Sequence, residues 1–144
     1  MCRQLVQATA PNRIPYLLTD RADMNIAAMS VTPERARQVM YSAPYADTSL
    51  AVYGAKSQTV KSQTVKSAAD LARLKVSVAK GTTEDITLTA ANPNAVIMRT
   101  EDNATAVQTY LSGQSDLLAA NSVVVVELAK KNPGKEFDFK FALR

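Results

Sequence analysis

Histidine and tryptophan are absent from the 144-residue sequence, and cysteine occurs once, as Cys2. Without histidine there is no imidazole base, so Ser-His-Asp and Cys-His catalytic pairs and any histidine-containing zinc site are excluded. A single cysteine forms neither a disulfide within the chain nor a multi-cysteine metal cluster. We therefore expect no metal and no cofactor.

Long apolar runs are missing too. Residues 123–126 are all valine, but no run approaches the about 20 apolar residues that a membrane-spanning helix needs. The first residues also lack the apolar segment of a secretory signal, which leaves the cellular compartment open.

Charge of one sign is only slightly in excess. The 17 Lys and Arg against 13 Asp and Glu give a formal net charge of +4, which suits an anionic ligand but is too small to indicate nucleic acid. With 47% hydrophobic and 21% charged residues, the composition is that of a globular chain. Its length allows one domain or two small lobes.

Strand-like and helix-like patterns alternate along the chain. The first half predicts helices that begin after Asn12 and after Thr32, and strands over residues 5–8, 24–29 and 49–53. The second half predicts helices over residues 84–91, 102–113 and 122–131, and strands over residues 75–79, 95–99, 116–120 and 137–143. In the last strand we expect Phe137, Phe139, Phe141 and Leu143 to share one side. This order predicts an α/β fold with a mostly parallel sheet that helices cover on both faces.

The five residues 56–60 are repeated at once as residues 61–65, Lys-Ser-Gln-Thr-Val in both copies. Two copies of so short a unit do not make a solenoid. We expect a surface loop that its lysines keep solvated. An anion-binding or peptide-binding stripe is the alternative, although no aromatic residues interleave with it.

Three segments follow strands at the rim where the carboxyl ends of parallel strands meet. In the first, Ser30 and Arg35 lie five residues apart at a helix start. A guanidinium offers a planar fork of donors, and the helix start adds N–H groups, so the two can clamp a carboxylate. The alternative is an ordinary capped helix, with Arg35 in a surface ion pair with Glu34 or another neighbour.

The second segment is Gly81, Thr82 and Thr83, and the third is Asn121. Glycine lets the backbone approach a ligand, and two hydroxyl groups with their N–H groups can bind an anion at a helix start. The Gly-Lys-Ser/Thr ending of a phosphate-binding P-loop is missing. The alternatives are a turn with a helix cap for residues 81–83, and a cap of the next helix for Asn121.

Eight motifs follow one another in an order that resembles a known family. They include Asn-Arg-Ile-Pro-Tyr-Leu-Leu at residues 12–18, Ser-Val-Thr-Pro-Glu-Arg at 30–35, Val-Ala-Lys-Gly-Thr-Thr at 78–83 and Leu-Ser-Gly-Gln-Ser-Asp-Leu at 111–117, with the others at 23–26, 41–45, 67–71 and 101–105. With these motifs the chain closely resembles the polar amino-acid-binding proteins of ABC importers, the family 3 solute-binding proteins. The resemblance covers nearly the whole chain.

The resemblance implies a periplasmic-binding-protein-like fold of type II, in which two α/β lobes close on a ligand like a hinge. Residues 52–144 would form a complete lobe 2. Residues 1–51 would form a partial lobe 1, which lacks an opening strand and helix and a returning strand. Because a partial sheet exposes its edges, we expect a homodimer or a swapped oligomer.

The resemblance also implies roles for the residues at the rim. Arg35 would clamp the α-carboxylate of an amino acid with the help of Ser30 and the backbone near Ala28. Gly81, Thr82 and Thr83 would contact the same carboxylate from the second lobe. Asn121 stands where the family usually has an aspartate for the amino group. Asparagine accepts a hydrogen bond but carries no charge, which costs on the order of 1–3 kcal/mol of binding.

The implied function is the periplasmic substrate-binding component of an ABC transporter, or a truncated derivative of one. It would bind a polar or acidic amino acid, or a similar carboxylate, deliver it to a membrane permease, and bind no nucleic acid. Two alternatives stay open. One is a scaffold fragment that no longer binds, and the other is an enzyme like cyclohexadienyl dehydratase on the same fold, with Glu84 as its acid.

Overall fold

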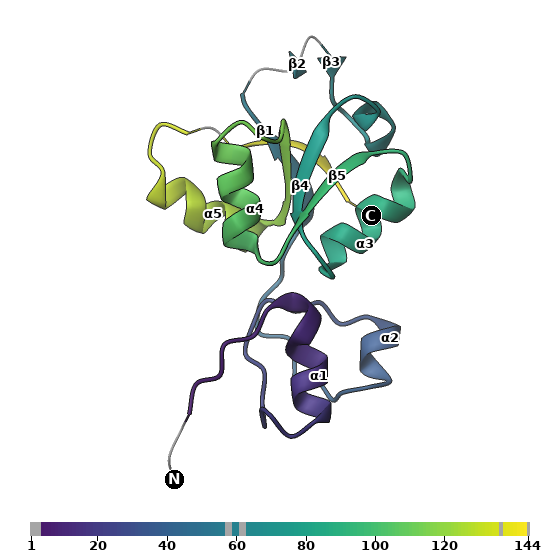
Figure 1. Cartoon of the computed structure of the whole chain (residues 1–144), viewed down its shortest axis with the longest axis vertical. Coiled ribbons are helices and arrows are strands. Elements are labelled where there is room, and N and C mark those ends of the chain that lie inside the picture. The colour runs from purple at the N-terminus through teal and green to yellow at the C-terminus, as the bar shows by residue number, and fades with distance from the viewer. Residues whose placement is uncertain (1–3, 57–58, 61–62, 136, 144) are drawn as a thin grey trace. The chain divides into compact units, whose positions relative to one another are not determined.

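The computed structural model describes the chain except residues 1–3, 57–58, 61–62, 136 and 144. The chain separates into two compact units, Met1–Asp47 and Thr48–Arg144 (Figure 1). Among the described residues, no helix has both the length and the apolar character needed to cross a membrane.

The second unit is built on a five-stranded sheet with the strand order β5-β4-β6-β1-β7. The strands are β1 (Leu50–Gly54), β4 (Lys75–Ala79), β5 (Val96–Thr100), β6 (Leu117–Asn121) and β7 (Asp138–Ala142). β4 pairs in parallel with β5 and β6, and β1 pairs antiparallel with β6 and β7. All strands but β1 thus run in one direction, which confirms a mixed, mostly parallel sheet.

Helices cover both faces of this sheet (Figure 1). On one face α3 (Thr83–Ala91) packs with its Leu88 among Val76, Val78 and Leu117, all of them fully buried. On the other face, α4 (Asn103–Leu111) and α5 (Ser122–Lys131) pack on Tyr53 and Leu118. The elements expected in the second half of the chain are all present, each with its start within about one residue of the prediction.

One expectation for β7 is wrong. Phe141 pairs with Val52 and belongs to the core beneath α3, whereas Phe139 pairs with Tyr53 and contacts its ring at a centroid distance of 6.3 Å. The pairing register shifts between Val52 and Tyr53, so Lys140 is an extra residue on β7. An inserted residue reverses the alternation of side chains, and the aromatic residues therefore divide between the two faces.

Two short parts of the repeated segment form strands. Thr59–Val60 forms β2 and Gln63–Thr64 forms β3, which pair antiparallel with each other; residues 57–58 and 61–62 of the repeat lie outside the described residues. Val65, the last residue of the second copy, is buried in the core beneath α3. The expectation of a solvated loop is therefore corrected at Val65. A short 3-10 helix, η2 (Ala68–Leu71), follows.

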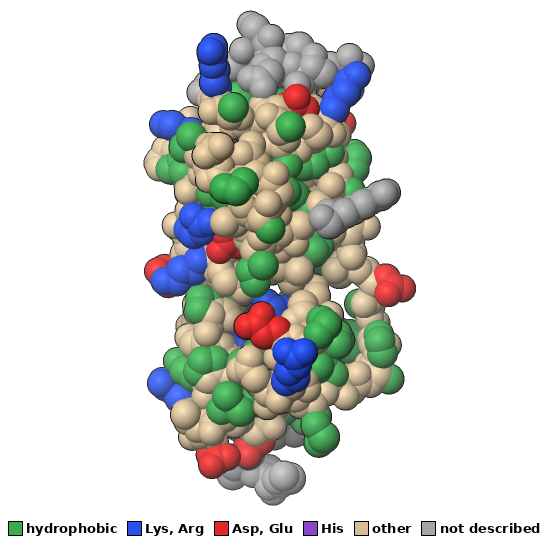
Figure 2. Space-filling view, turned by 90° about the vertical axis from the view of Figure 1, so that its right-hand side faces the viewer, with side chains coloured by type: hydrophobic (Ala, Val, Ile, Leu, Met, Phe, Trp, Pro, Cys, Tyr) green, Lys and Arg blue, Asp and Glu red, His purple; other side chains and the backbone are tan. Residues whose placement is uncertain are grey.

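The first unit contains only short helices: η1 (Ala10–Asn12), α1 (Arg13–Leu18) and α2 (Pro33–Ala36). Residues 4–47 include no strand and no buried residue, and Figure 2 shows hydrophobic side chains at the surface of both units. The predictions of strands over residues 5–8 and 24–29 are wrong, with Leu5 99% and Ile26 81% exposed. An apolar run forms a strand only where another strand pairs with it, and this unit supplies none among its described residues.

Candidate functional site

Arg35 and Ser30 are hydrogen-bonded to each other in the first unit. The Arg35 Nη1 atom donates a hydrogen bond to the Ser30 carbonyl oxygen at 3.2 Å, and the Tyr41 hydroxyl donates to the same oxygen at 3.4 Å. Thr32 caps α2 by accepting from the Arg35 N–H. The contact thus uses the carbonyl of Ser30 and not its hydroxyl. Because α2 has only four residues, the expected contribution of its dipole is small.

The backbone near Ala28 is held by side chains and not by strand pairing. The Ala28 carbonyl accepts from Arg13 Nη1 at 3.4 Å, and the Ala27 carbonyl accepts from the Tyr45 hydroxyl at 2.7 Å. Sequence reasoning missed Arg13, Tyr41 and Tyr45 as residues that order this segment. The only signal for them was that each stands in one of the family-like motifs.

In the second unit, Gly81 and Thr82 lie between β4 and α3, and Thr83 is the first residue of α3; these three residues are here called the 81–83 loop. Gly81 has a φ of +70°, a conformation that glycine adopts without strain. The Thr82 hydroxyl donates to the Ala79 carbonyl at 2.8 Å and accepts from the Asp85 N–H at 3.3 Å, so it caps α3. The Gly81 N–H donates to Asp85 Oδ2 at 3.0 Å. These groups of the loop bond within the protein.

The start of α3 nevertheless presents donors without acceptors. Within the described part of the chain, no acceptor bonds to the backbone N–H groups of Thr82 and Glu84. Such N–H groups at the positive end of a nine-residue helix form a favourable environment for an anion. The start of α3 therefore offers two N–H donors to an anion.

An ion pair that sequence reasoning missed lies behind the loop. Arg99, on β5, places its Nε atom 2.8 Å from Asp85 Oδ1, and the Asp85 side chain is only 10% exposed. Arg99 Nη2 also donates to Thr89 Oγ1 at 2.7 Å, and that hydroxyl donates to the Asp85 carbonyl at 2.7 Å. The sequence gives no direct signal for this pair, because β5 comes next to α3 only in the folded sheet.

Asn121 ends β6 and is buried, with 8% of its surface exposed. Its Oδ1 atom accepts from the Val124 N–H at 3.1 Å, so it caps α5, as one of the two interpretations expects. Because β6 and β4 are parallel neighbours, Asn121 and the 81–83 loop lie at the same edge of the sheet. The structure thus brings these four residues to one rim.

Three other acidic residues have structural partners. Asp102 caps α4, Glu101 forms an ion pair with Lys80, and Asp116 Oδ2 accepts from the Lys75 N–H. Within the described residues, no group of three or more His, Cys, Asp or Glu side chains could hold a metal ion.

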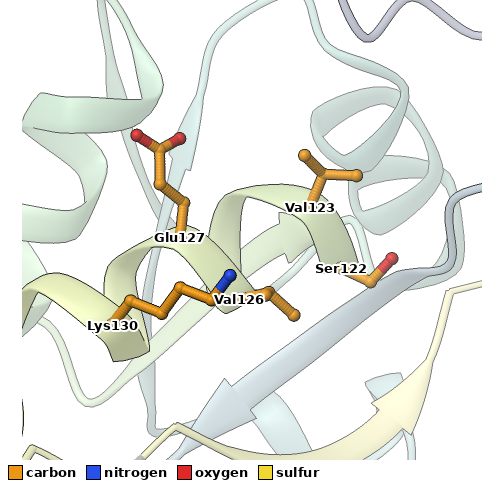
Figure 3. A pocket seen from close by; sticks show the side chains of 5 residues that line it. All are labelled: Ser122, Val123, Val126, Glu127 and Lys130. Atoms are coloured by element: carbon orange, nitrogen blue, oxygen red, sulfur yellow. The ribbon is translucent and has the colours of Figure 1, made fainter.

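A surface hollow of about 350 Å³ lies along α5 (Figure 3). It is lined by Ser122, Val123, Val126, Glu127 and Lys130. Ser122 follows Asn121 in sequence, but no residue of the predicted site lines this hollow.

Comparison with known proteins identifies the family of this chain. Residues 3–133 match the model of the bacterial extracellular solute-binding proteins, family 3. The chain belongs to this family. It is similar to the ABC transporter glutamine-binding protein GlnH of Bacillus subtilis, with 28% identity over 130 residues that cover 90% of this chain and 46% of the relative. It is also 28% identical to the ABC transporter arginine-binding protein 1 of Escherichia coli, over 92% of this chain and 55% of the relative.

Solved structures of amino-acid-binding proteins have the same fold. A mutant of ArgBP from T. maritima superposes with a TM-score of 0.84 at 26% identity, over 98% of this chain and 59% of that one. The cysteine-binding protein of Campylobacter jejuni superposes with a TM-score of 0.83 at 26% identity, over 96% and 53%. The predicted periplasmic-binding-protein-like fold of type II is thereby confirmed.

The chain spans about half the length of the curated relatives it matches. These relatives and the solved structures are named as binding proteins and not as enzymes, in agreement with the prediction of a non-catalytic protein. Members of the family are extracellular solute-binding proteins.

Proposed function

We propose that this chain is the amino-acid-binding component of an ABC importer, or a shortened form of it, and that it acts in the periplasm with a membrane permease as its partner. The observation that carries this proposal is the family match over residues 3–133. Relatives are named for glutamine, arginine, histidine and cysteine, so their ligands share an α-carboxylate and an α-ammonium group with a polar side chain. The proposed ligand class is accordingly the polar amino acids.

For the first unit, we propose that Arg35 binds the α-carboxylate, with Ser30 and the backbone near Ala28 beside it. The support is chemical: a guanidinium recognises a carboxylate with two parallel hydrogen bonds. The bond from Nη1 to the Ser30 carbonyl orients the guanidinium plane, and Arg35 is half-buried. A side chain that is already ordered loses less conformational entropy when it binds.

For the second unit, we propose that the 81–83 loop binds a carboxylate of the amino acid and that Asn121 accepts a hydrogen bond from its α-ammonium group. The unpartnered N–H groups of Thr82 and Glu84 at the start of α3 support the first role. The position of Asn121 on the same rim as the loop supports the second. We take residues 52–144 as lobe 2 of the family fold and residues 1–51 as a partial lobe 1.

Calorimetry against L-glutamine, L-arginine, L-histidine and L-cysteine tests this function. We expect binding of at least one of them, and a loss of about 10- to 150-fold in Arg35→Ala, because a charged hydrogen-bonded contact contributes roughly 1.5–3 kcal/mol. Arg37→Ala is the matched control, since Arg37 is exposed and neighbours the same helix. Equal binding by Arg35→Ala and the parent would remove the clamp from the proposal.

Two further outcomes identify the alternatives. A folded parent that binds none of the four amino acids, and whose melting temperature none of them raises, points to a scaffold without ligand. Turnover of a prephenate-like substrate that is lost in Glu84→Gln points to an enzyme instead.

We also propose that the chain forms a homodimer or a swapped oligomer. The support is the first unit, in which Leu5, Met24, Ile26 and Met40 are all more than 70% exposed. Exposed apolar side chains are stabilised when another chain covers them. Light scattering should give a mass above 15.5 kDa. A mass equal to that of one chain at every concentration would contradict the oligomer while leaving amino-acid binding untouched.

A further inference from the structure

A single carboxylate joins the 81–83 loop to strand β5. Asp85 lies in the first turn of α3, and its two oxygen atoms have different partners. Oδ2 accepts the Gly81 N–H at 3.0 Å, and Oδ1 accepts Arg99 Nε at 2.8 Å. The Asp85 side chain is 10% exposed, whereas the Arg99 side chain is 43% exposed. The orientation of the Gly81 peptide is therefore coupled to the position of Arg99.

Arg99 is itself held at a second point. Its Nη2 atom donates to Thr89 Oγ1 at 2.7 Å, one turn further along α3. Because Nε and Nη2 bond to two different residues, the plane of the guanidinium is fixed, which the single ammonium of a lysine would not achieve. Arg99 thus connects β5 to two positions of α3 that are one turn apart.

The charge of Arg99 also matters for a ligand. A carboxylate bonded to the loop that receives an anion would repel that anion if its charge were not compensated. The Arg99 guanidinium at 2.8 Å compensates the charge of Asp85. The N–H groups at the start of α3 then remain attractive to a carboxylate.

We propose that Asp85 and Arg99 are a positioning pair for ligand binding. Asp85 holds Gly81 at its φ of +70°, and Arg99 neutralises Asp85 so that the 81–83 loop can receive an anionic group. The role in binding rests on the function proposed above. The hydrogen bond by which Asp85 orders the 81–83 loop does not depend on that function. The two parts are therefore tested separately.

Hydrogen exchange of the Gly81 amide, followed by NMR without ligand, tests whether Asp85 orders the 81–83 loop through the Gly81 N–H. We expect exchange to rise about tenfold or more in Asp85→Ala, which removes the acceptor. In Asp85→Asn the rate should stay within about threefold of the parent, because the amide oxygen still accepts. Thr87→Ala is the control, since that side chain makes no hydrogen bond with the described residues of the chain. An unchanged Gly81 rate in Asp85→Ala would overturn the proposal.

Calorimetry with L-arginine and L-glutamine tests the effect on binding. We expect Arg99→Met to weaken binding about tenfold, because it leaves the Asp85 charge uncompensated beside the ligand. Adding Asp85→Asn to Arg99→Met should restore affinity to within about threefold of the parent, since the pair is then neutral and Gly81 keeps its acceptor. A purely structural role predicts that the double variant binds no better than Arg99→Met, and that result would overturn the charge argument.

Circular dichroism melting of each variant separates loss of fold from loss of binding. If Asp85→Ala does not fold, the comparison of Arg99→Met with the double variant still decides the proposal. If the parent binds neither amino acid, the function proposed above fails, and the Gly81 exchange rates alone decide whether Asp85 holds the loop.

Discussion

Phe139 and Phe141, two residues apart on β7, lie on opposite faces of the sheet. Phe141 is 8% exposed and packs in the core beneath α3, whereas Phe139 is 55% exposed and meets the edge of the Tyr53 ring. In a regular strand these two side chains would point the same way. The extra residue at Lys140 places the two side chains on opposite faces. The two rings therefore contribute differently to the free energy of unfolding.

The first prediction follows from this difference. Phe141→Ala should lower the free energy of unfolding by about 3–4 kcal/mol, because it leaves a cavity in the core. Phe139→Ala should cost only about 1 kcal/mol, for a half-exposed ring and one aromatic contact. Urea unfolding of both variants measures the difference. Equal costs would contradict the assignment of the two rings to opposite faces.

The register shift also shows where sequence reasoning ends. Alternation along residues 137–143 is visible in the sequence, but the bulge depends on pairing with β1, which lies more than 80 residues earlier. Residues 75–79 and 116–120 were predicted well because their patterns agree with strands that do pair. Residues 24–29 carry an equally apolar pattern, yet no described strand of the first unit pairs with them. Pattern alone does not supply a partner.

In the candidate site, too, some contacts can be predicted from the sequence and others depend on the fold. Local spacing indicates Asn121 either as a cap of α5 or as a ligand contact, and the structure shows the cap. The bond from Arg35 to the Ser30 carbonyl was not predicted. The ion pair of Asp85 with Arg99 joins residues 14 positions apart, and it depends on how β5 packs beside α3. Interactions within one turn of a helix can be read from spacing, whereas interactions between elements need the fold.

Asp102 provides the second prediction, which concerns pH. Hydrogen bonds from the Thr105 backbone N–H and then from the Thr105 side chain hold the pKa of Asp102 below its ordinary value. A group with a lowered pKa stabilises the folded state above its unfolded pKa of about 3.9, and this contribution is lost as the pH falls through the folded pKa. Asp102→Ala should therefore cost about 1 kcal/mol near neutral pH, as expected for loss of a helix cap.

This cost should shrink as the pH falls below the ordinary aspartate pKa. Urea midpoints of the parent and Asp102→Ala, measured from neutral to acidic pH, test it, with Asp47→Ala as an exposed-carboxylate control. A cost that stays constant over the whole range would show that the charge of Asp102 does not act as the cap.

Tyr53 provides the third prediction. Burial raises the pKa of Tyr53, and the negative charge of Glu84 raises it further. Its contribution to stability is complete below the unfolded pKa of about 10 and is lost as the pH rises through the folded pKa. Absorbance titration should show a last tyrosine that ionises after the others. This step should disappear in Tyr53→Phe and remain in Tyr45→Phe, since Tyr45 is exposed; a last step that survives in Tyr53→Phe would refute the assignment.

The fourth prediction concerns the amino group of the ligand. If Asn121 accepts a hydrogen bond from the α-ammonium, Asn121→Asp adds a charge to that contact. We expect an affinity gain of roughly 5- to 150-fold for L-arginine or L-glutamine, equivalent to about 1–3 kcal/mol. The fold should be retained, because aspartate caps a helix as well as asparagine does and its charge suits the start of α5.

A second ligand distinguishes the effect of this contact on affinity from the effect of the added negative charge. The Nα-acetyl form of the same amino acid keeps the carboxylate and the side chain but has no ammonium group. Calorimetry should show that Asn121→Asp gains affinity for the free amino acid and loses some for the acetylated one, because the new carboxylate then faces an uncharged amide near another anion. If both ligands respond alike, Asn121 acts only as the cap of α5, and the amino group is recognised elsewhere.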